Sequence, residues 1–76
     1  MKSFVLISIE DQHEREVLDN LKSMPEVKNA YLLFGEWDIL AEIEMESPDQ
    51  LDTFVIDKLR SDEKVKLTSS LLVAGR

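Results

Sequence analysis

The hydrophobic residues follow two spacings, one typical of strands and one typical of helices. Phe4–Ile9 is a short run rich in β-branched and aromatic residues, so it predicts a strand with apolar side chains on both faces. Asp11 and Glu14 then have the spacing of a capping box, and Pro25 marks a helix end. Between them, apolar residues recur with helical periodicity and predict a buried stripe of Val17, Leu18, Leu21 and Met24.

Two further strands are predicted in the middle of the chain, joined as a β-hairpin. The second strand comprises Val27 and Ala30–Phe34, and the third is Asp38–Met45. Apolar and polar residues alternate along the third strand, which predicts one dry face and one largely polar face. Only Gly35–Trp37 separates the two strands, and a gap of that length is typical of a hairpin.

The last third of the chain predicts a second helix and a fourth strand. Ser47 as N-cap, Pro48 at the first helical position and Gln50 make a strong helix start. The buried stripe expected for this helix consists of Leu51, Phe54, Val55 and Leu59. A polar loop, Ser61–Lys64, then leads into a strand at Val65–Val73.

The order strand, helix, strand, strand, helix, strand predicts an α+β protein. Two strand–helix–strand units joined by a hairpin give the ferredoxin-like βαββαβ fold, a four-stranded antiparallel sheet with two helices on one face. The first strand is apolar on both sides, so one of its two sets must lie on the uncovered face, where such a patch marks an interface. The sets are Phe4/Leu6 and Val5/Ile7/Ile9. We therefore expect dimerisation through the sheet, of the dimeric α+β barrel type.

The size of the chain also favours self-association. Its 76 residues predict a single domain, 1–76, and a fold of this size buries only about 60% of the surface its unfolded chain exposes. There are no cysteines, so disulfides and thiolate metal sites are not available. Oligomerisation is the usual remaining source of stability for so short a domain.

Charge and hydropathy exclude several classes of partner. Sixteen acidic residues against nine Lys+Arg give a net charge of −7, which disfavours direct binding to DNA or RNA. No apolar stretch approaches the roughly 20 residues needed to span a bilayer. The start of the chain runs directly into a strand pattern without a cleavage site, so we expect a cytoplasmic protein that does not bind a membrane.

Several short motifs carry a resemblance to a known family. They are Val27 ahead of the second strand, Tyr31 with Phe34-Gly35, the Gly-x-aromatic-Asp pattern of Gly35–Asp38, and Val65-x-x-Thr68-x-Ser70 before an apolar end. In this order, over essentially the whole chain, they resemble the ligand-binding (RAM) domain of the Lrp/AsnC (feast/famine) regulators.

The resemblance implies a non-enzymatic module that binds an amino acid or a similar small metabolite between subunits, without a cofactor or metal. Regulators of the family carry an N-terminal helix-turn-helix domain, whereas this sequence begins at the first strand, which implies a stand-alone RAM protein. Such a protein would act on transcription through a partner, for example a full-length Lrp/AsnC regulator. In the family, domains pair through their sheets, dimers join into rings of commonly eight or ten subunits, and amino-acid effectors bind between dimers near the Gly-x-aromatic-Asp turn.

The turn has groups suited to a zwitterionic amino acid. Asp38 is expected to accept from the α-ammonium in a charge-assisted bond, with Glu36 as a weaker candidate. Backbone N–H groups around Gly35 can donate to the α-carboxylate because no Cβ blocks the approach. Trp37 would form a wall of the pocket. Each residue also has a structural explanation: glycine and aspartate suit a tight turn, and tryptophan is enriched at subunit interfaces.

Thr68 and Ser70 lie on one face of the predicted fourth strand, so they could add hydroxyl groups to the same pocket. Strand propensity alone would also explain a threonine there.

Two other functions compete with effector binding. The first is a scaffold subunit that binds no ligand. The second is a small enzyme of the dimeric α+β barrel type, which needs titratable groups converging in a cleft. His13, the only histidine, lies among charged residues where solvated surface is expected, and Tyr31 is the only tyrosine. An acid–base set is hard to assemble from these groups.

Overall fold

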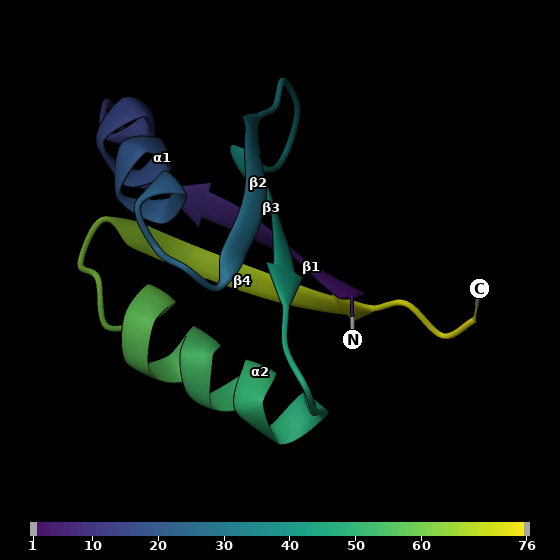
Figure 1. The fold of residues 1–76 in the computed structure, drawn as a ribbon. Helices are drawn as coiled ribbons and strands as arrows, with labels where there is room; N and C mark the ends of the chain where they lie inside the picture. Colours follow the sequence, from purple (N-terminus) through teal and green to yellow (C-terminus); the bar gives the residue numbers. More distant parts are fainter. Residues whose placement is uncertain (1, 76) are drawn as a thin grey trace.

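The computed structural model describes residues 2–75 and contains a four-stranded antiparallel sheet. The strands stand in the order β2-β3-β1-β4, and their bounds are β1 Lys2–Ile9, β2 Val27–Leu32, β3 Ile39–Glu44 and β4 Val65–Leu72 (Figure 1). The helices are α1 Glu14–Lys22 and α2 Pro48–Phe54, and α2 continues as a π-helical turn, η1 Val55–Leu59. The predicted ferredoxin-like fold is confirmed.

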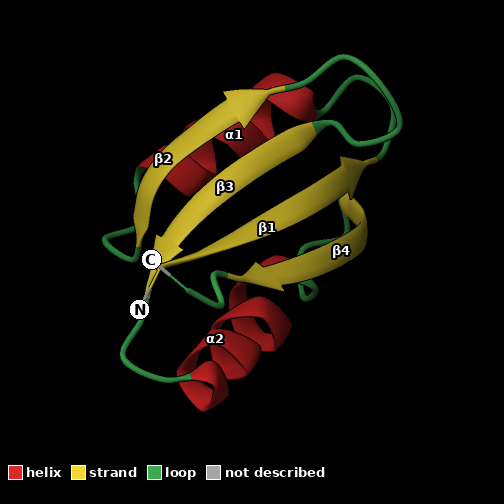
Figure 2. Ribbon diagram, turned by 90° about the vertical axis from the view of Figure 1, so that its right-hand side faces the viewer, coloured by secondary structure: helices red, strands yellow, loops and turns green. Residues whose placement is uncertain are grey.

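Both helices lie on one side of the sheet. Figure 2 looks onto the other side, with α1 behind β2 and β3. Alternate residues of β1 and β3 point toward the helices, and in β1 these are Val5, Ile7 and Ile9, all almost fully buried. Both helical stripes predicted from the sequence pack against them: Val17, Leu18 and Leu21 from α1, and Leu51, Phe54, Val55 and Leu59 from α2 and η1. Burying one such side chain contributes about 1.5–3 kcal/mol to folding.

The alternation in β1 settles which set lies on the uncovered face. Phe4 and Leu6 point away from the helices because Val5 and Ile7 point toward them. The strand register extends this face on both sides, since paired residues share a face of the sheet. Phe4 is paired with Leu71, Leu6 with Leu40, and Leu40 with Tyr31, while Ser8 is paired with Leu67. We call this surface the open sheet face; its large apolar residues are Phe4, Leu6, Tyr31, Leu40, Leu67 and Leu71.

The start of α2 agrees with the sequence prediction. The Ser47 hydroxyl oxygen accepts a hydrogen bond from the backbone N–H of Gln50 (3.2 Å), and Pro48 occupies the first turn. The Gln50 side-chain oxygen reaches back and accepts from the N–H of Glu46 (2.9 Å). Two N–H groups at the helix start are thus satisfied reciprocally.

The predicted capping box of α1 is wrong. The helix begins at Glu14 with His13 as its N-cap residue, and no side chain caps it. Asp11 lies in a turn closed by a hydrogen bond from His13 N–H to Glu10 O (3.3 Å). Gln12 in this turn has a φ of 70°, so the chain is not yet helical at the position that a capping box would need.

The hairpin connection is longer than predicted. β2 ends at Leu32 and β3 begins at Ile39, so residues 33–38 form the loop instead of Gly35–Trp37 alone. The N–H of Leu33 donates to Asp38 O across the base of this loop (2.8 Å). Within residues 33–38, no further backbone hydrogen bond joins the two sides of the loop beyond this one, so the turn is wider than a tight hairpin turn.

Removing the side chains of Ser47 and Asp11 in turn tests the observation that Ser47 caps α2 and Asp11 does not cap α1. Ser47→Ala is expected to lower the free energy of unfolding by about 1 kcal/mol because the N–H of Gln50 loses its acceptor. Asp11→Ala is the matched control and should change it by less than about 0.5 kcal/mol. Urea unfolding followed by circular dichroism measures both. A larger loss for Asp11→Ala than for Ser47→Ala would contradict the observed boundary of α1.

Candidate functional site

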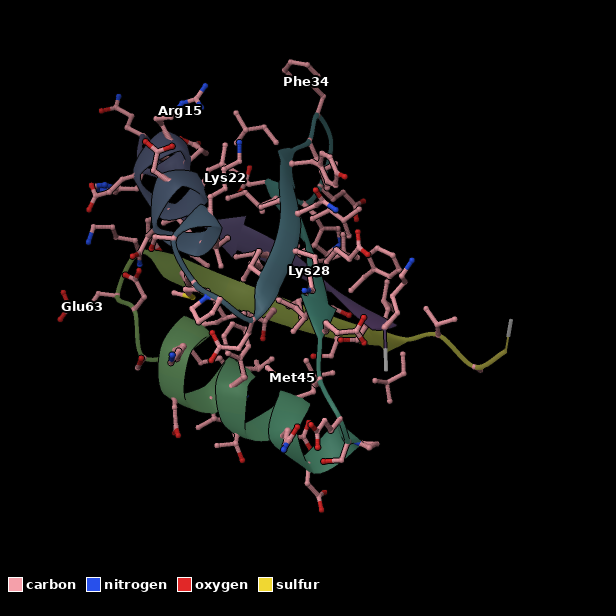
Figure 3. The ribbon with its side chains drawn as sticks, viewed as in Figure 1. Arg15, Lys22, Lys28, Phe34, Met45 and Glu63 are labelled. Carbon is pink, nitrogen blue, oxygen red and sulfur yellow. The ribbon has the colours of Figure 1, made fainter. Side chains whose placement is uncertain are left out.

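The tip of the β2–β3 hairpin exposes unusual backbone. Gly35 has a φ of 142°, a conformation that L side chains rarely adopt, so a glycine is required there although the space around its Cα is open. Phe34 beside it is fully exposed and projects from the tip (Figure 3). The N–H groups of residues 34–37 donate no hydrogen bond to any atom of residues 2–75. The fold therefore does not use these four donors.

Asp38 is held by hydrogen bonds to β1 and to the loop base. Its N–H donates to Ile7 O (2.9 Å), and its carboxylate Oδ2 accepts from the N–H of Ile9 (2.7 Å). Its carbonyl oxygen accepts from Leu33. Oδ1 has no hydrogen-bond partner among the described residues. Asp38 therefore has the structural role of hydrogen-bonding to backbone N–H groups, and one of its carboxylate oxygens has no partner among the described residues.

A hollow of about 390 Å³ lies beside this carboxylate, between the hairpin and the start of α1. We call it the hairpin hollow; it is lined by Glu14, Leu32, Leu33, Phe34, Gly35 and Asp38. Two of the predicted site residues, Gly35 and Asp38, thus lie together.

Glu14 is a lining residue that the sequence reasoning missed. Its spacing from Asp11 predicts a place in a capping box instead. The predicted topology could have indicated that Glu14 lies near the hairpin. Because β1 and β2 are parallel to one another, the start of α1 and the hairpin after β2 lie at the same end of the sheet.

Glu36 and Trp37 lie at the edge of the open sheet face instead. With Ser8 and Leu67 they line a smaller hollow of about 150 Å³. Ser8 and Leu67 are paired residues of β1 and β4 on that face. Trp37 is therefore placed where a second chain covering the open sheet face would contact it.

Thr68 and Ser70 are separated from the hairpin within one chain. They are paired with Ile7 and Val5 on the helix side of β4. Thr68 lines a hollow of about 250 Å³ formed by residues 65–68 and Arg60. The structure does not bring these two hydroxyl groups into the hairpin hollow of the same subunit, so their predicted role requires a neighbouring subunit.

Several of the other titratable groups form surface pairs. His13 Nδ1 lies 3.6 Å from a carboxylate oxygen of Glu16, and its side chain is about half exposed. The Lys64 ammonium lies 3.0 Å from the other Glu16 oxygen, and this hydrogen bond lowers the pKa of Glu16. Within residues 2–75, no three His, Asp or Glu side chains are placed to hold a metal ion.

A further hollow of about 370 Å³ lies at the opposite end of the sheet, against α2. Met45 and Phe54 form its apolar part, and Met45 points toward α2 in Figure 3. At its rim, Lys58 Nζ lies 3.3 Å from Glu26 Oε2. This hollow shares no lining residue with the hairpin hollow.

A family model described as the Lrp/AsnC ligand binding domain matches residues 2–76. The chain belongs to this family. Among curated relatives, the uncharacterized HTH-type transcriptional regulator PH1916 of Pyrococcus horikoshii is 30% identical over 73 residues, and PF0250 of Pyrococcus furiosus is 29% identical over 73. Each match covers 92% of this chain and 49% of the relative, so the chain spans about half the length of the curated relatives it matches.

Solved structures share the fold of this Lrp/AsnC domain closely. FFRP-DM1 is 35% identical with a TM-score of 0.90, covering 95% of this chain and 96% of that one. The protein PHS023 from Pyrococcus horikoshii is 33% identical with a TM-score of 0.89, covering 99% and 90%. A regulator from Neisseria meningitidis, NMB0573, solved as an L-Met complex, is 28% identical with a TM-score of 0.88, covering 97% and 49%.

These matches place the chain among regulatory ligand-binding domains. PH1916, PF0250 and NMB0573 are all named as transcriptional regulators, and none of the three names describes an enzyme. None of the helices in residues 2–75 has the length and apolar content needed to cross a bilayer.

The dual role of Asp38 can be tested on stability alone. Asp38→Ala is expected to lower the free energy of unfolding by about 1–3 kcal/mol because the part-buried N–H of Ile9 loses its acceptor. Asp38→Asn keeps a side-chain oxygen and should lose less than half as much. Urea unfolding of the two variants measures the difference. Equal losses would show that the charge, rather than the hydrogen bond to Ile9, stabilises the fold.

Proposed function

We propose that this Lrp/AsnC domain binds an amino acid at the hairpin hollow, in an assembly of several copies, and influences transcription through a partner protein. A full-length regulator of the same family is the partner that fits best, in the cytoplasm. The domain itself performs no catalysis. The observation that carries the proposal is that Phe34 and Gly35, whose backbone N–H groups are unbonded, line one hollow together with Asp38, whose Oδ1 has no hydrogen-bond partner among the described residues.

The chemistry matches the two charges of an amino acid. The α-ammonium is a donor and suits Asp38 Oδ1, whose sister oxygen is already fixed by Ile9 at 2.7 Å. The α-carboxylate is an acceptor and suits the unbonded N–H groups of Phe34 and Gly35, the two residues of the turn that line this hollow. Leu32, Leu33 and Phe34 supply apolar walls, and a neighbouring subunit that covers these exposed side chains would exclude water from the bonds. The L-Met complex of the related NMB0573 supports an amino acid as the class of ligand.

The remaining predicted residues take part through neighbouring copies. Trp37 and Glu36 border the open sheet face, so a subunit packed there would contact them. Thr68 and Ser70 lie on the other side of β4 and would reach a ligand held by a different subunit. A ring of dimers, of eight or ten chains, would provide such a neighbour.

A screen of the twenty amino acids by thermal shift tests effector binding. A ligand that binds only the folded form at a hundredfold excess over its Kd adds about 2.7 kcal/mol, which raises the melting temperature of a domain of this size by roughly 10–20 °C. Isothermal titration of the best ligand against Asp38→Asn should then show an affinity loss of at least about tenfold, or 1.4 kcal/mol. Equal affinity would refute the ammonium role of Asp38. No shift with any amino acid would favour a scaffold that binds no ligand.

The open sheet face is proposed as the contact between paired copies. Leu67 and Leu71 on β4 are 63% and 47% exposed in a single chain. They lie beside Phe4 and Leu6, which are partly exposed, so the four side chains form one apolar surface. A contiguous apolar surface of this kind marks an interface. Pairing there would supply the apolar burial that a 76-residue fold lacks on its own.

A charged substitution on that face tests the pairing. Leu67→Glu is expected to produce monomers at micromolar concentration, because burying an unpaired carboxylate at the contact is unfavourable. Ile56→Glu is the matched control, since Ile56 on the helix layer is 57% exposed and should leave the dimer intact. Light scattering and sedimentation velocity give the masses. A wild-type monomer under the same conditions would refute pairing through the sheet.

A further inference from the structure

The hairpin hollow carries more negative charge than a neutral amino acid can satisfy. Its lining contains two carboxylates, Glu14 and Asp38, and no lysine, arginine or histidine. In the proposed function, Asp38 takes the α-ammonium and the backbone N–H groups take the α-carboxylate. Glu14 then remains as an anion at the hollow without a role.

The Glu14 side chain is unpaired. As the first residue of α1 it is only partly exposed, and it makes no hydrogen bond or ion pair with any of residues 2–75. Its helical neighbour Glu16, in contrast, is paired with both His13 and Lys64. The free carboxylate of Glu14 therefore faces a hollow that has no cation of its own.

The walls between the two carboxylates are apolar. Leu32, Leu33 and Phe34 line the same hollow, and Phe34 and Leu32 are otherwise exposed. An aliphatic stem with a charge at its far end would cover these side chains and place the charge beside Glu14. A lysine side chain has this form, four methylene groups ending in an ammonium.

We propose that the effector is a basic amino acid, with its side-chain cation paired to Glu14. The inference rests on the proposed function, because it uses the same hollow and the same roles for Asp38 and the backbone. Glu14 is the residue that sets specificity. The net charge of −7 adds a longer-range attraction for cations, and this part weakens as salt is raised.

Titration calorimetry with two matched ligands tests the specificity. L-Lysine and L-norleucine share the backbone and a four-carbon stem, but norleucine lacks the ammonium. The wild-type protein is expected to bind lysine at least about tenfold more tightly, which corresponds to 1.4 kcal/mol. In Glu14→Gln, the ratio of the two affinities should fall to within about twofold of one.

Glu63→Gln is the control for net charge. Glu63 lies in the loop before β4 (Figure 3), lines neither the hairpin hollow nor the other hollows described above, and its substitution changes the charge equally. This variant should keep the lysine preference of the wild type. Thermal melting of each variant confirms that it is folded before titration.

The outcomes separate this inference from the proposed function. Norleucine binding as tightly as lysine, or a lysine preference that survives in Glu14→Gln, would overturn the specificity alone. Absence of binding by lysine, norleucine and the other amino acids would overturn the proposed function, and the inference with it.

Discussion

The constraint on which this structure depends is that β1 is apolar on both faces while helices cover only one. Val5 and Ile7 have no exposed surface, and they organise the core shared by the sheet and both helices. Phe4 and Leu6, on the same strand, have no helix above them. Because β1 is also a central strand, its uncovered side sets the character of the whole open sheet face. An exposed apolar face of this kind is typical of a surface that packs against another protein.

At the hairpin, the structural role of Asp38 and its proposed role in recognition use different atoms. The backbone and Oδ2 of Asp38 extend the pairing between β1 and β3 by bonds to Ile7 and Ile9. Because those bonds already order the carboxylate, a ligand bound by Oδ1 would pay little further cost for ordering this side chain. A structural explanation for Asp38 and a binding role are therefore compatible. The same division holds for Gly35, whose φ shapes the turn and whose amide stays unbonded.

The fold was predictable because burial imposes strong periodicity on a short chain. The stripes of both helices and the start of α2 at Ser47 were all visible in the sequence. The start of α1 was not, because it depends on a left-handed residue, Gln12, and on a tertiary bond from Glu10 N–H to Lys64 O (2.8 Å). The hairpin hollow was only partly predictable. Its turn residues stood together in a motif, whereas Glu14 reaches it from another element through the topology.

The two ends of the folded chain share one location. The N–H of Val73 donates to Lys2 O (3.3 Å), and Ser3 is paired with Leu72, so β1 begins where β4 ends. Figure 1 shows this junction at the far end of the sheet from the β2–β3 connection. A polypeptide fused to either terminus, such as an affinity tag, a fluorescent reporter or a second module, would therefore leave the domain at that end of the sheet, away from the hairpin hollow.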